Sequence, residues 1–236
     1  MGRPTLTLPT VREVLRLALP FGSQVVAGTL GTERPVRRAR VGGVLSPIFA
    51  ELDSEELALL DLRRVQASNP GLTGARVVRD LNRLGIAALG VVGTVDRPAQ
   101  REAERANLPL LQLPDGSDLA QGARAVQRLI DDPEAQIAVQ GGALYRHLVE
   151  GGMAGQGLEW MVTRLHELTG HAVQLADAEG ALLAEAGNEP APASSQRHEW
   201  PLHVGGQTVG QLTFEGAEAE LDRKSTRLNS SHTQKS

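Results

Sequence analysis

Gly85-Ile86-Ala87-Ala88-Leu89-Gly90-Val91-Val92 is the stretch of sequence that decides the fold. Every residue in it is apolar or glycine, and polar positions do not alternate with apolar ones. A strand with this pattern is covered on both faces, which is typical of a parallel sheet between two layers of helices. The run therefore predicts a central strand of an α/β domain.

The segments around this strand continue the same pattern. Residues 77–84 carry apolar side chains at helical spacing, and Gly85 is a suitable stop for that helix. Residues 98–106 form a short charged segment with Pro98 in its first turn, which favours a helix, and residues 108–113 predict another strand. Strands and helices that alternate in this order form βαβ units, so we expect a largely parallel sheet.

The beginning of the chain predicts one helix and two short strands. Thr10 and Glu13 have the spacing of a capping box, so a helix should begin directly after Thr10. Residues 24–27 and 36–41 are short runs suited to strands on either side of a turn-prone segment.

Residues 54–60 leave two alternatives open. Ser54 is a suitable cap for a helix, and the residues after it have helical propensity. The same apolar run also suits a buried strand that leads to Asp61, because so short a run has no decisive period.

A helical segment and a small second unit follow. Residues 119–150 are helical in character, and Asp131-Asp132-Pro133 should divide them into two helices or bend one. A flexible joint is expected at four glycines: Gly151, Gly152, Gly155 and Gly157. The second unit should contain a helix over residues 158–168 that ends at Gly170.

The rest of the second unit predicts an antiparallel sheet. Residues 172–176 and 181–184 favour strands joined by a turn, and residues 188–196 favour a loop. Residues 200–204 and 208–214 should form a hairpin with Gly205-Gly206 at its turn.

The last residues are expected to have a different origin from the rest. Residues 222–232 match, in unbroken order, the conceptual translation of a common sequencing-library adapter. We therefore expect residues 222–236 to be an artefact tail and the open reading frame to run off a contig end near Leu221. The alternative is a genuine polar tail, since the same residue types suit a disordered terminus.

Composition excludes several classes of protein. The chain has a net charge of −4, and because residues 222–236 contribute +3, the residues before them carry −7. An acidic body argues against a nucleic-acid-binding surface. The absence of cysteine excludes disulfides and thiolate chemistry. No run is long enough to span a membrane and no export leader is evident, so a cytoplasmic location is expected.

Many short segments, in their order and spacing, resemble the PucR-type (purine catabolism regulator-like) transcriptional regulators. Five of them lie in the first half of the chain: Leu8-Pro9-Thr10-Val11-Arg12-Glu13-Val14-Leu15, Pro20-Phe21-Gly22, Val25-Val26-Ala27-Gly28, Leu84-Gly85-Ile86-Ala87-Ala88-Leu89-Gly90-Val91 and Leu108-Pro109-Leu110-Leu111-Gln112-Leu113-Pro114. Residues 144–187 resemble the linker helix and GAF-like module of the same family, with Leu148-Val149-Glu150-Gly151-Gly152, Leu168-Thr169-Gly170 and Leu175-Ala176-Asp177-Ala178-Glu179-Gly180.

The resemblance implies a fold and a domain plan. The fold class is α/β: a mainly parallel sensory domain over residues 1–116, a helical linker over 117–157, and a truncated GAF-like α+β module over 158–221, followed by the artefact tail at 222–236. The family implies that residues 56–61 form a strand rather than a helix. A C-terminal helix-turn-helix, which would bind DNA, should lie beyond residue 221.

The resemblance also implies a function: the ligand-sensing part of a bacterial transcriptional regulator, with an unidentified small-molecule effector, a homodimer as its assembly, no cofactor and no membrane partner. The family commonly has His-Val-Ser-Glu where this chain has Arg40-Val41-Gly42-Gly43. Effector-binding residues are therefore not transferred. Two alternatives are an α/β enzyme of unknown chemistry and a ligand-free interaction scaffold.

No catalytic or metal site is predicted. His166 and His171 are five residues apart with Gly170 between them, whereas a helical metal pair needs a spacing of four. His198 and His203 should lie on opposite faces of a regular strand. Both pairs are therefore interpreted as structural or surface residues.

Other polar and glycine clusters also have structural interpretations. Gly85, Gly90 and Gly93 lack the spacing of a dinucleotide loop and favour a turn or close packing. The basic residues Arg37, Arg38 and Arg40 are expected on an exposed strand edge, with a phosphate or effector site as the alternative. The adjacent pairs Glu55-Glu56 and Asp131-Asp132 point to different faces, so neither pair is expected to form an acid/base dyad. Asp131 and Asp132, before Pro133, fit helix termination and capping.

Overall fold

The computed structural model describes residues 8–43, 48, 52–187 and 195–217 and divides into two compact units, Met1–Gly142 and Ala143–Ser236. The predicted tail at 222–236 and most of the predicted loop at 188–196 lie outside the described residues.

The first unit contains a five-stranded sheet in the order β1-β5-β4-β3-β2. Strands β2 to β5 are parallel, and β1 pairs with β5 in the antiparallel direction. The strands are β1 (Gln24–Ala27), β2 (Arg38–Val41), β3 (Glu56–Asp61), β4 (Ala88–Val92) and β5 (Leu110–Leu113). The predicted α/β class and largely parallel sheet are confirmed, and the ambiguous segment is a strand.

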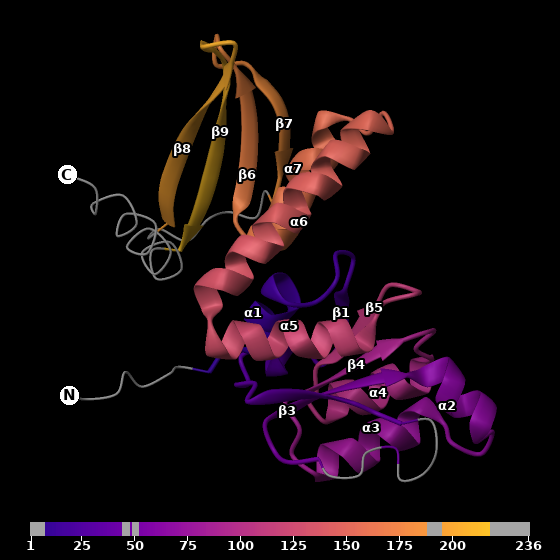
Figure 1. Ribbon diagram of the computed structural model, residues 1–236. Coiled ribbons are helices and arrows are strands. Elements are labelled where there is room, and N and C mark those ends of the chain that lie inside the picture. The colour runs from indigo at the N-terminus through magenta and orange to yellow at the C-terminus, as the bar shows by residue number, and fades with distance from the viewer. Residues whose placement is uncertain (1–7, 44–47, 49–51, 188–194, 218–236) are drawn as a thin grey trace, which may run out of the picture. The chain divides into compact units, whose positions relative to one another are not determined.

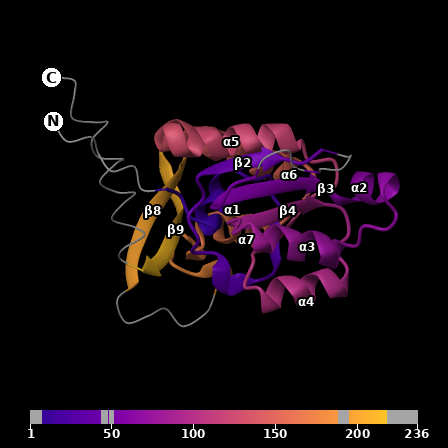
Figure 2. The same cartoon turned by 90° about the horizontal axis from the view of Figure 1, so that it is seen from below.

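Helices cover both faces of this sheet (Figures 1 and 2). On one face lie α2 (Leu62–Ser68), α3 (Gly74–Arg83) and α4 (Arg97–Arg105), and on the other lie α1 (Val11–Leu17) and α5 (Leu119–Asp131). Strand β4 is apolar throughout because both of its faces are covered. Leu89 and Val91 face the layer of α2, α3 and α4, while Ala88 and Val92 face the layer of α1 and α5. A short 3-10 turn, Thr29–Gly31, follows β1.

Two glycines in this unit are required by packing. A Cβ on Gly90 would lie 2.7 Å from Cδ2 of Leu59, and Gly85 follows α3 with a φ of +72°. The predicted explanation of these glycines by close packing and a turn is confirmed. Helix α2 was not predicted, because its apolar positions are too few to show a period.

Sequence patterns located the helix ends well. Thr10 accepts a hydrogen bond from the Glu13 amide while the Glu13 side chain bonds back to the Thr10 amide, which confirms the capping box of α1. The segment around Pro133 forms two helices, α5 and α6 (Pro133–Met153). The Asp132 side chain accepts from the Ala135 amide at 3.1 Å, so it caps α6 as expected.

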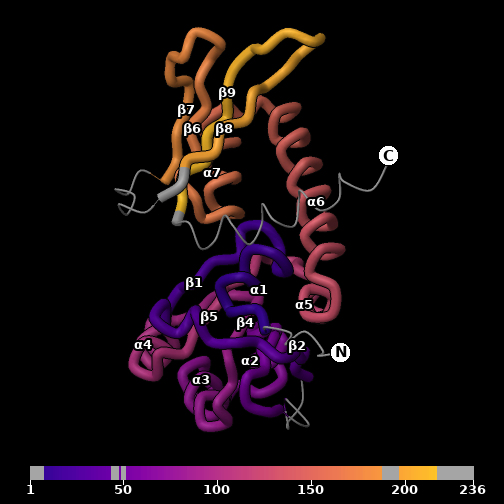
Figure 3. Tube along the Cα trace, turned by 90° about the vertical axis from the view of Figure 1, so that its left-hand side faces the viewer, coloured from indigo at the N-terminus to yellow at the C-terminus, as the bar shows by residue number. Residues whose placement is uncertain are grey.

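The second unit contains a four-stranded antiparallel sheet in the order β7-β6-β9-β8. Its elements are α7 (Leu158–Thr169), β6 (Ala172–Asp177), β7 (Leu182–Ala186), β8 (Ser195–Val204) and β9 (Gln207–Ala217). Helix α7 packs on β6 and β7 over a small core that includes Val162, Val173 and Ala184 (Figure 3). The hairpin turn at Gly205-Gly206 is confirmed, although β8 and β9 are longer than predicted.

The predicted flexible joint is partly wrong. Gly151 and Gly152 belong to α6, which continues to Met153. A Cβ on Gly151 would lie 2.3 Å from the Trp160 ring, so this glycine allows α6 and α7 to approach closely. Glycine is present here because it is small enough for close packing. The sequence alone does not show whether a glycine is present for close packing or for flexibility.

Candidate functional site

The carboxyl ends of the parallel strands form the candidate ligand-binding edge of the first unit. The chain leaves β3 and β4 toward α2 and α4 on one face of the sheet, but leaves β5 toward α5 on the other. In open α/β sheets, ligands bind outside the carboxyl ends of the strands, where neighbouring connections diverge. The loops over residues 93–96 and 114–118 are therefore the best-placed segments to contact a ligand.

An ion pair joins the loops of this edge. Arg63, at the start of α2, pairs with Asp115, which follows β5. The Arg63 stem lies beside Gly93, where a Cβ would be 3.0 Å from the Arg63 Cγ and where φ is +112°. Only glycine readily adopts this positive φ and also leaves room for the Arg63 side chain. Gly93 therefore helps to position Arg63 at this edge. The Gln112 side-chain amide donates to the Gly93 carbonyl at 3.4 Å.

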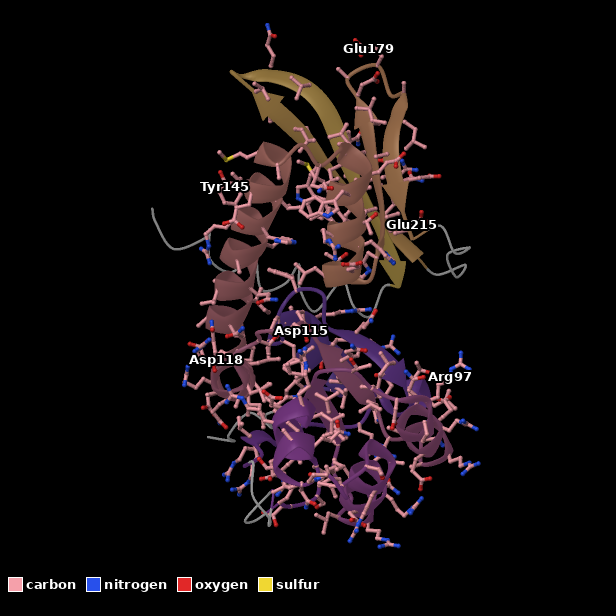
Figure 4. All side chains as sticks on the ribbon, turned by 90° about the vertical axis from the view of Figure 1, so that its right-hand side faces the viewer. Arg97, Asp115, Asp118, Tyr145, Glu179 and Glu215 are labelled. Atoms are coloured by element: carbon pink, nitrogen blue, oxygen red, sulfur yellow. The ribbon has the colours of Figure 1, made fainter. Side chains whose placement is uncertain are left out.

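The helix starts at this edge are occupied by aspartates of the chain itself. The side chains of Asp61, Asp96 and Asp118 accept from the backbone amides of Arg64 at 3.1 Å, Ala99 at 2.8 Å and Gln121 at 3.0 Å. Figure 4 shows Asp118 and Asp115 in the segment that leads to α5. These carboxylates use the amides that an anion would need, so the edge favours a neutral polar ligand.

Two residues of the predicted basic cluster, Arg38 and Arg40, lie on β2, an edge strand of the sheet, and Arg37 directly precedes it. Arg37 pairs with Glu55 at 2.9 Å, and the Arg40 Nε pairs with Oε2 of Glu56 at 2.7 Å. Arg38 is exposed. The edge-strand interpretation is therefore confirmed.

Glu56 has a role that the sequence did not reveal. Its side chain is only 2% exposed and also accepts from the Asp53 amide at 3.3 Å. A buried carboxylate needs such partners, because its desolvation is costly. Arg40 therefore neutralises a carboxylate within the fold. Glu55 and Glu56 bind different arginines, which agrees with the prediction that they do not act as a pair.

The histidines have separate structural partners. His166 Nδ1 lies 2.8 Å from the His171 backbone carbonyl, and Gly170 between them ends α7 with a φ of +68°. His198 stacks against Trp200 with a centroid separation of 5.8 Å, and His203 Nδ1 lies 3.3 Å from the Thr208 hydroxyl. Within the described residues, no three His, Asp or Glu side chains come together as a metal site.

Two buried glutamines on α6 form a polar contact that sequence reasoning missed. Gln136 is 1% exposed and donates through Nε2 to the Leu17 carbonyl at 2.8 Å, while its Oε1 accepts from Arg128 at 3.1 Å. Gln140, one turn later, donates to the Arg16 carbonyl at 3.3 Å. The last carbonyls of a helix have no partner within it, so these two amides complete the end of α1. We call Gln136 and Gln140 the glutamine clasp.

The second unit has one open groove of interest. It has a volume of about 330 Å³ and lies between α7 and the edge strand β7, lined by Glu159, Thr163, Leu182, Leu183, Ala184 and Glu185. Its charged rim carries only carboxylates. Among the described residues, no helix is long and apolar enough to cross a membrane.

Comparison with known families identifies the class of protein. Residues 13–130 match the model of the purine catabolism regulatory protein-like family, PucR. This match covers half of the chain and extends from α1 to the last turn of α5. The chain belongs to this family, which confirms the resemblance inferred from its sequence.

No curated protein matches the chain. A solved structure of the CBS and DRTGG domains of the regulatory region of Clostridium perfringens pyrophosphatase, complexed with its activator diadenosine tetraphosphate, shares 14% sequence identity with a TM-score of 0.34. The match covers 55% of this chain and 50% of that one.

Proposed function

We propose that this chain is the ligand-sensing and regulatory portion of a bacterial transcriptional regulator. The single observation that carries the proposal is the family match over residues 13–130, which spans nearly all of the α/β sheet and its helices. The proposed regulator is cytoplasmic and homodimeric. It binds DNA through a helix-turn-helix outside this sequence, and its second unit serves as a GAF-like module.

The effector is a small neutral metabolite that binds at the carboxyl edge of the parallel sheet. Arg63 and Asp115 supply donors and acceptors that are 58% and 73% exposed, so a ligand can reach both. A purine base is the ligand class that the family name suggests. Its ring nitrogens and exocyclic groups suit one donor and one acceptor side by side, and the guanidinium plane can stack on a flat ring.

The glutamine clasp gives a route for the signal within the first unit. Helix α5 packs on the sheet and is followed at once by α6, whose first turns are bonded to the end of α1. A ligand that favours one arrangement of the loops at residues 93–96 and 114–118 would shift α5, and with it the start of α6. Such a shift is a change of population between two states.

A thermal-shift screen tests the proposal. Purines and their neutral derivatives are added to the whole chain, and a ligand that binds only the native state must raise the Tm. The Arg63→Ala variant should lose this rise while its Tm without ligand stays within about 2 °C, since surface substitutions change stability little. Arg83→Ala is the matched control, because Arg83 is an arginine that is 71% exposed and lies at the C-terminal end of α3, away from the proposed site.

Other outcomes separate the alternatives. A ligand whose effect survives Arg63→Ala binds elsewhere and contradicts the proposed site. Conversion of an added metabolite into a product would establish the enzyme alternative. If no compound in a broad metabolite set raises the Tm, the scaffold alternative stands.

A further inference from the structure

Helix α6 has an exposed face that is mostly apolar, with Arg146 as a charged residue at its margin. Four large side chains on it are strongly exposed: Val139 (51%), Tyr145 (70%), Val149 (42%) and Met153 (85%). Ala135 and Ala138 are exposed on the same side, and Gly142 is partly exposed between them. Figure 4 shows Tyr145 on the side of α6 that points away from α7.

The opposite face of α6 is already occupied. Gln136 and Gln140 bond to the end of α1, and Gly151 packs against Trp160. A helix packed on one side normally presents charged and polar residues on the other. The exposed side of α6 instead presents apolar residues to solvent, which is typical of an interaction surface.

The apolar residues repeat with the spacing of a helix–helix seam. Steps of three and four residues alternate along the exposed face: Ala135, Ala138, Gly142, Tyr145 and Val149. This 3.5-residue period places about one residue per turn against a partner helix. With 21 residues, α6 is about 30 Å long, enough for such a seam.

The order of sizes along the seam identifies the partner. Its first half contains only Ala135, Ala138 and Gly142, and its second half contains Tyr145 and Val149. A second copy of the helix in the antiparallel direction places small residues against large ones. Tyr145 of one copy then faces Gly142 of the other, and Val149 faces Ala138. Large and small residues that face each other interdigitate, which is how tight cores are packed.

We propose that α6 pairs with α6 of a second copy of the chain, antiparallel, with the two-fold axis between residues 143 and 144. The proposal rests on the homodimer included in the proposed function and assigns its interface. One self-complementary surface is what a two-fold dimer requires. A parallel pair would place Tyr145 against Tyr145 and leave a gap at Gly142.

The first test is the oligomeric state of the whole chain by sedimentation equilibrium. The chain should be dimeric at micromolar concentration, and Tyr145→Glu should raise the dimer Kd at least about tenfold, because two charges become buried without partners. Leu182→Glu is the matched control: Leu182 is 54% exposed on β7 in the same unit. A monomeric chain, or an equal loss in the control, overturns the proposal.

The second test determines the direction of pairing. The chain has no cysteine, so single thiols can be introduced without a background. A mixture of Ala138→Cys and Val149→Cys chains should be joined by a short thiol crosslinker, whereas each variant alone should not. Glu150→Cys in place of Val149→Cys is the neighbouring control. Efficient crosslinking of Val149→Cys alone would establish a parallel pair and overturn the antiparallel arrangement.

These results are independent of the ligand screen. A monomer that gains thermal stability from a purine contradicts this interface and leaves the sensory role intact. A dimer that passes both tests but binds no metabolite supports the interface and contradicts the sensory role.

Discussion

Arg79 and Glu102 form the best-defined charged contact between two helices of the first unit. Arg79 of α3 holds both oxygens of Glu102 on α4, with Nε–Oε1 and Nη2–Oε2 distances of 3.0 and 3.3 Å. This hydrogen bonding lowers the pKa of Glu102 below the ordinary value of a glutamate, and the attraction of Arg79 adds to it. The same pair raises the pKa of Arg79.

The lowered pKa predicts how stability depends on pH. A carboxyl group whose pKa is lower in the folded state stabilises the fold above its unfolded pKa, and this contribution is lost as the pH falls through the folded value. We expect Glu102→Gln to lower the Tm at neutral pH and to reduce the loss of Tm on acidification. Thermal unfolding monitored by circular dichroism between neutral and acid pH measures both effects.

The double variant is the control for this pair. In a chain that already carries Arg79→Gln, Glu102→Gln should change the Tm little at any pH, because its partner is gone. An undiminished effect of Glu102→Gln in that background would show that the lowered pKa has another cause.

At the level of elements, the glutamine clasp holds α6 to α1. Gln136→Leu keeps the volume of the side chain but removes one donor and one acceptor, which leaves the Leu17 carbonyl and Arg128 without this partner. Loss of buried hydrogen bonds of this kind costs about 1–3 kcal/mol. We expect urea unfolding to show a decrease of this size in the free energy of unfolding, with faster amide exchange in the first turns of α6.

A glutamine on the neighbouring helix provides the comparison. Gln127 of α5 is exposed and bonds to Asp131 at 3.0 Å. Gln127→Leu should change stability by less than about 0.5 kcal/mol. If the two substitutions have equal effects, the clasp does not hold the helix.

At the scale of the whole molecule, the two units have separate cores. Leu59 is fully buried between the sheet and the α1/α5 layer of the first unit, and Val162 is buried in the second. Both tryptophans, Trp160 and Trp200, belong to the second unit, so intrinsic fluorescence reports on that unit alone.

This distribution predicts two separable unfolding transitions. Leu59→Ala should destabilise the first unit by about 2–5 kcal/mol. In the Leu59→Ala variant, the circular dichroism transition of the first unit should shift while the fluorescence midpoint stays unchanged. In the Val162→Ala variant, the fluorescence midpoint itself should move. A fluorescence midpoint that moves equally in both variants would show that the chain unfolds as one cooperative unit.

The sequence by itself determined the elements and the class of fold. Three signals depend only on residues that are neighbours in the chain: the apolar run before Val92, the capping box at Thr10 and the helix stop at Gly170. Such local preferences can be recognised directly from the sequence. The strand that ends at Asp61 and the helix α2 after it were exceptions, because segments this short show no decisive period.

Only the tertiary structure decided which polar residues far apart in the chain meet. Arg63 and Asp115 are 52 residues apart in the chain, and Gln136 and Leu17 are 119 apart. The burial of Glu56 beside Arg40 likewise depends on how β2 is placed next to β3. The physical reason is that contacts between residues far apart in the chain depend on how the helices pack on the sheet. The local conformational preferences of the two residues do not predict such contacts.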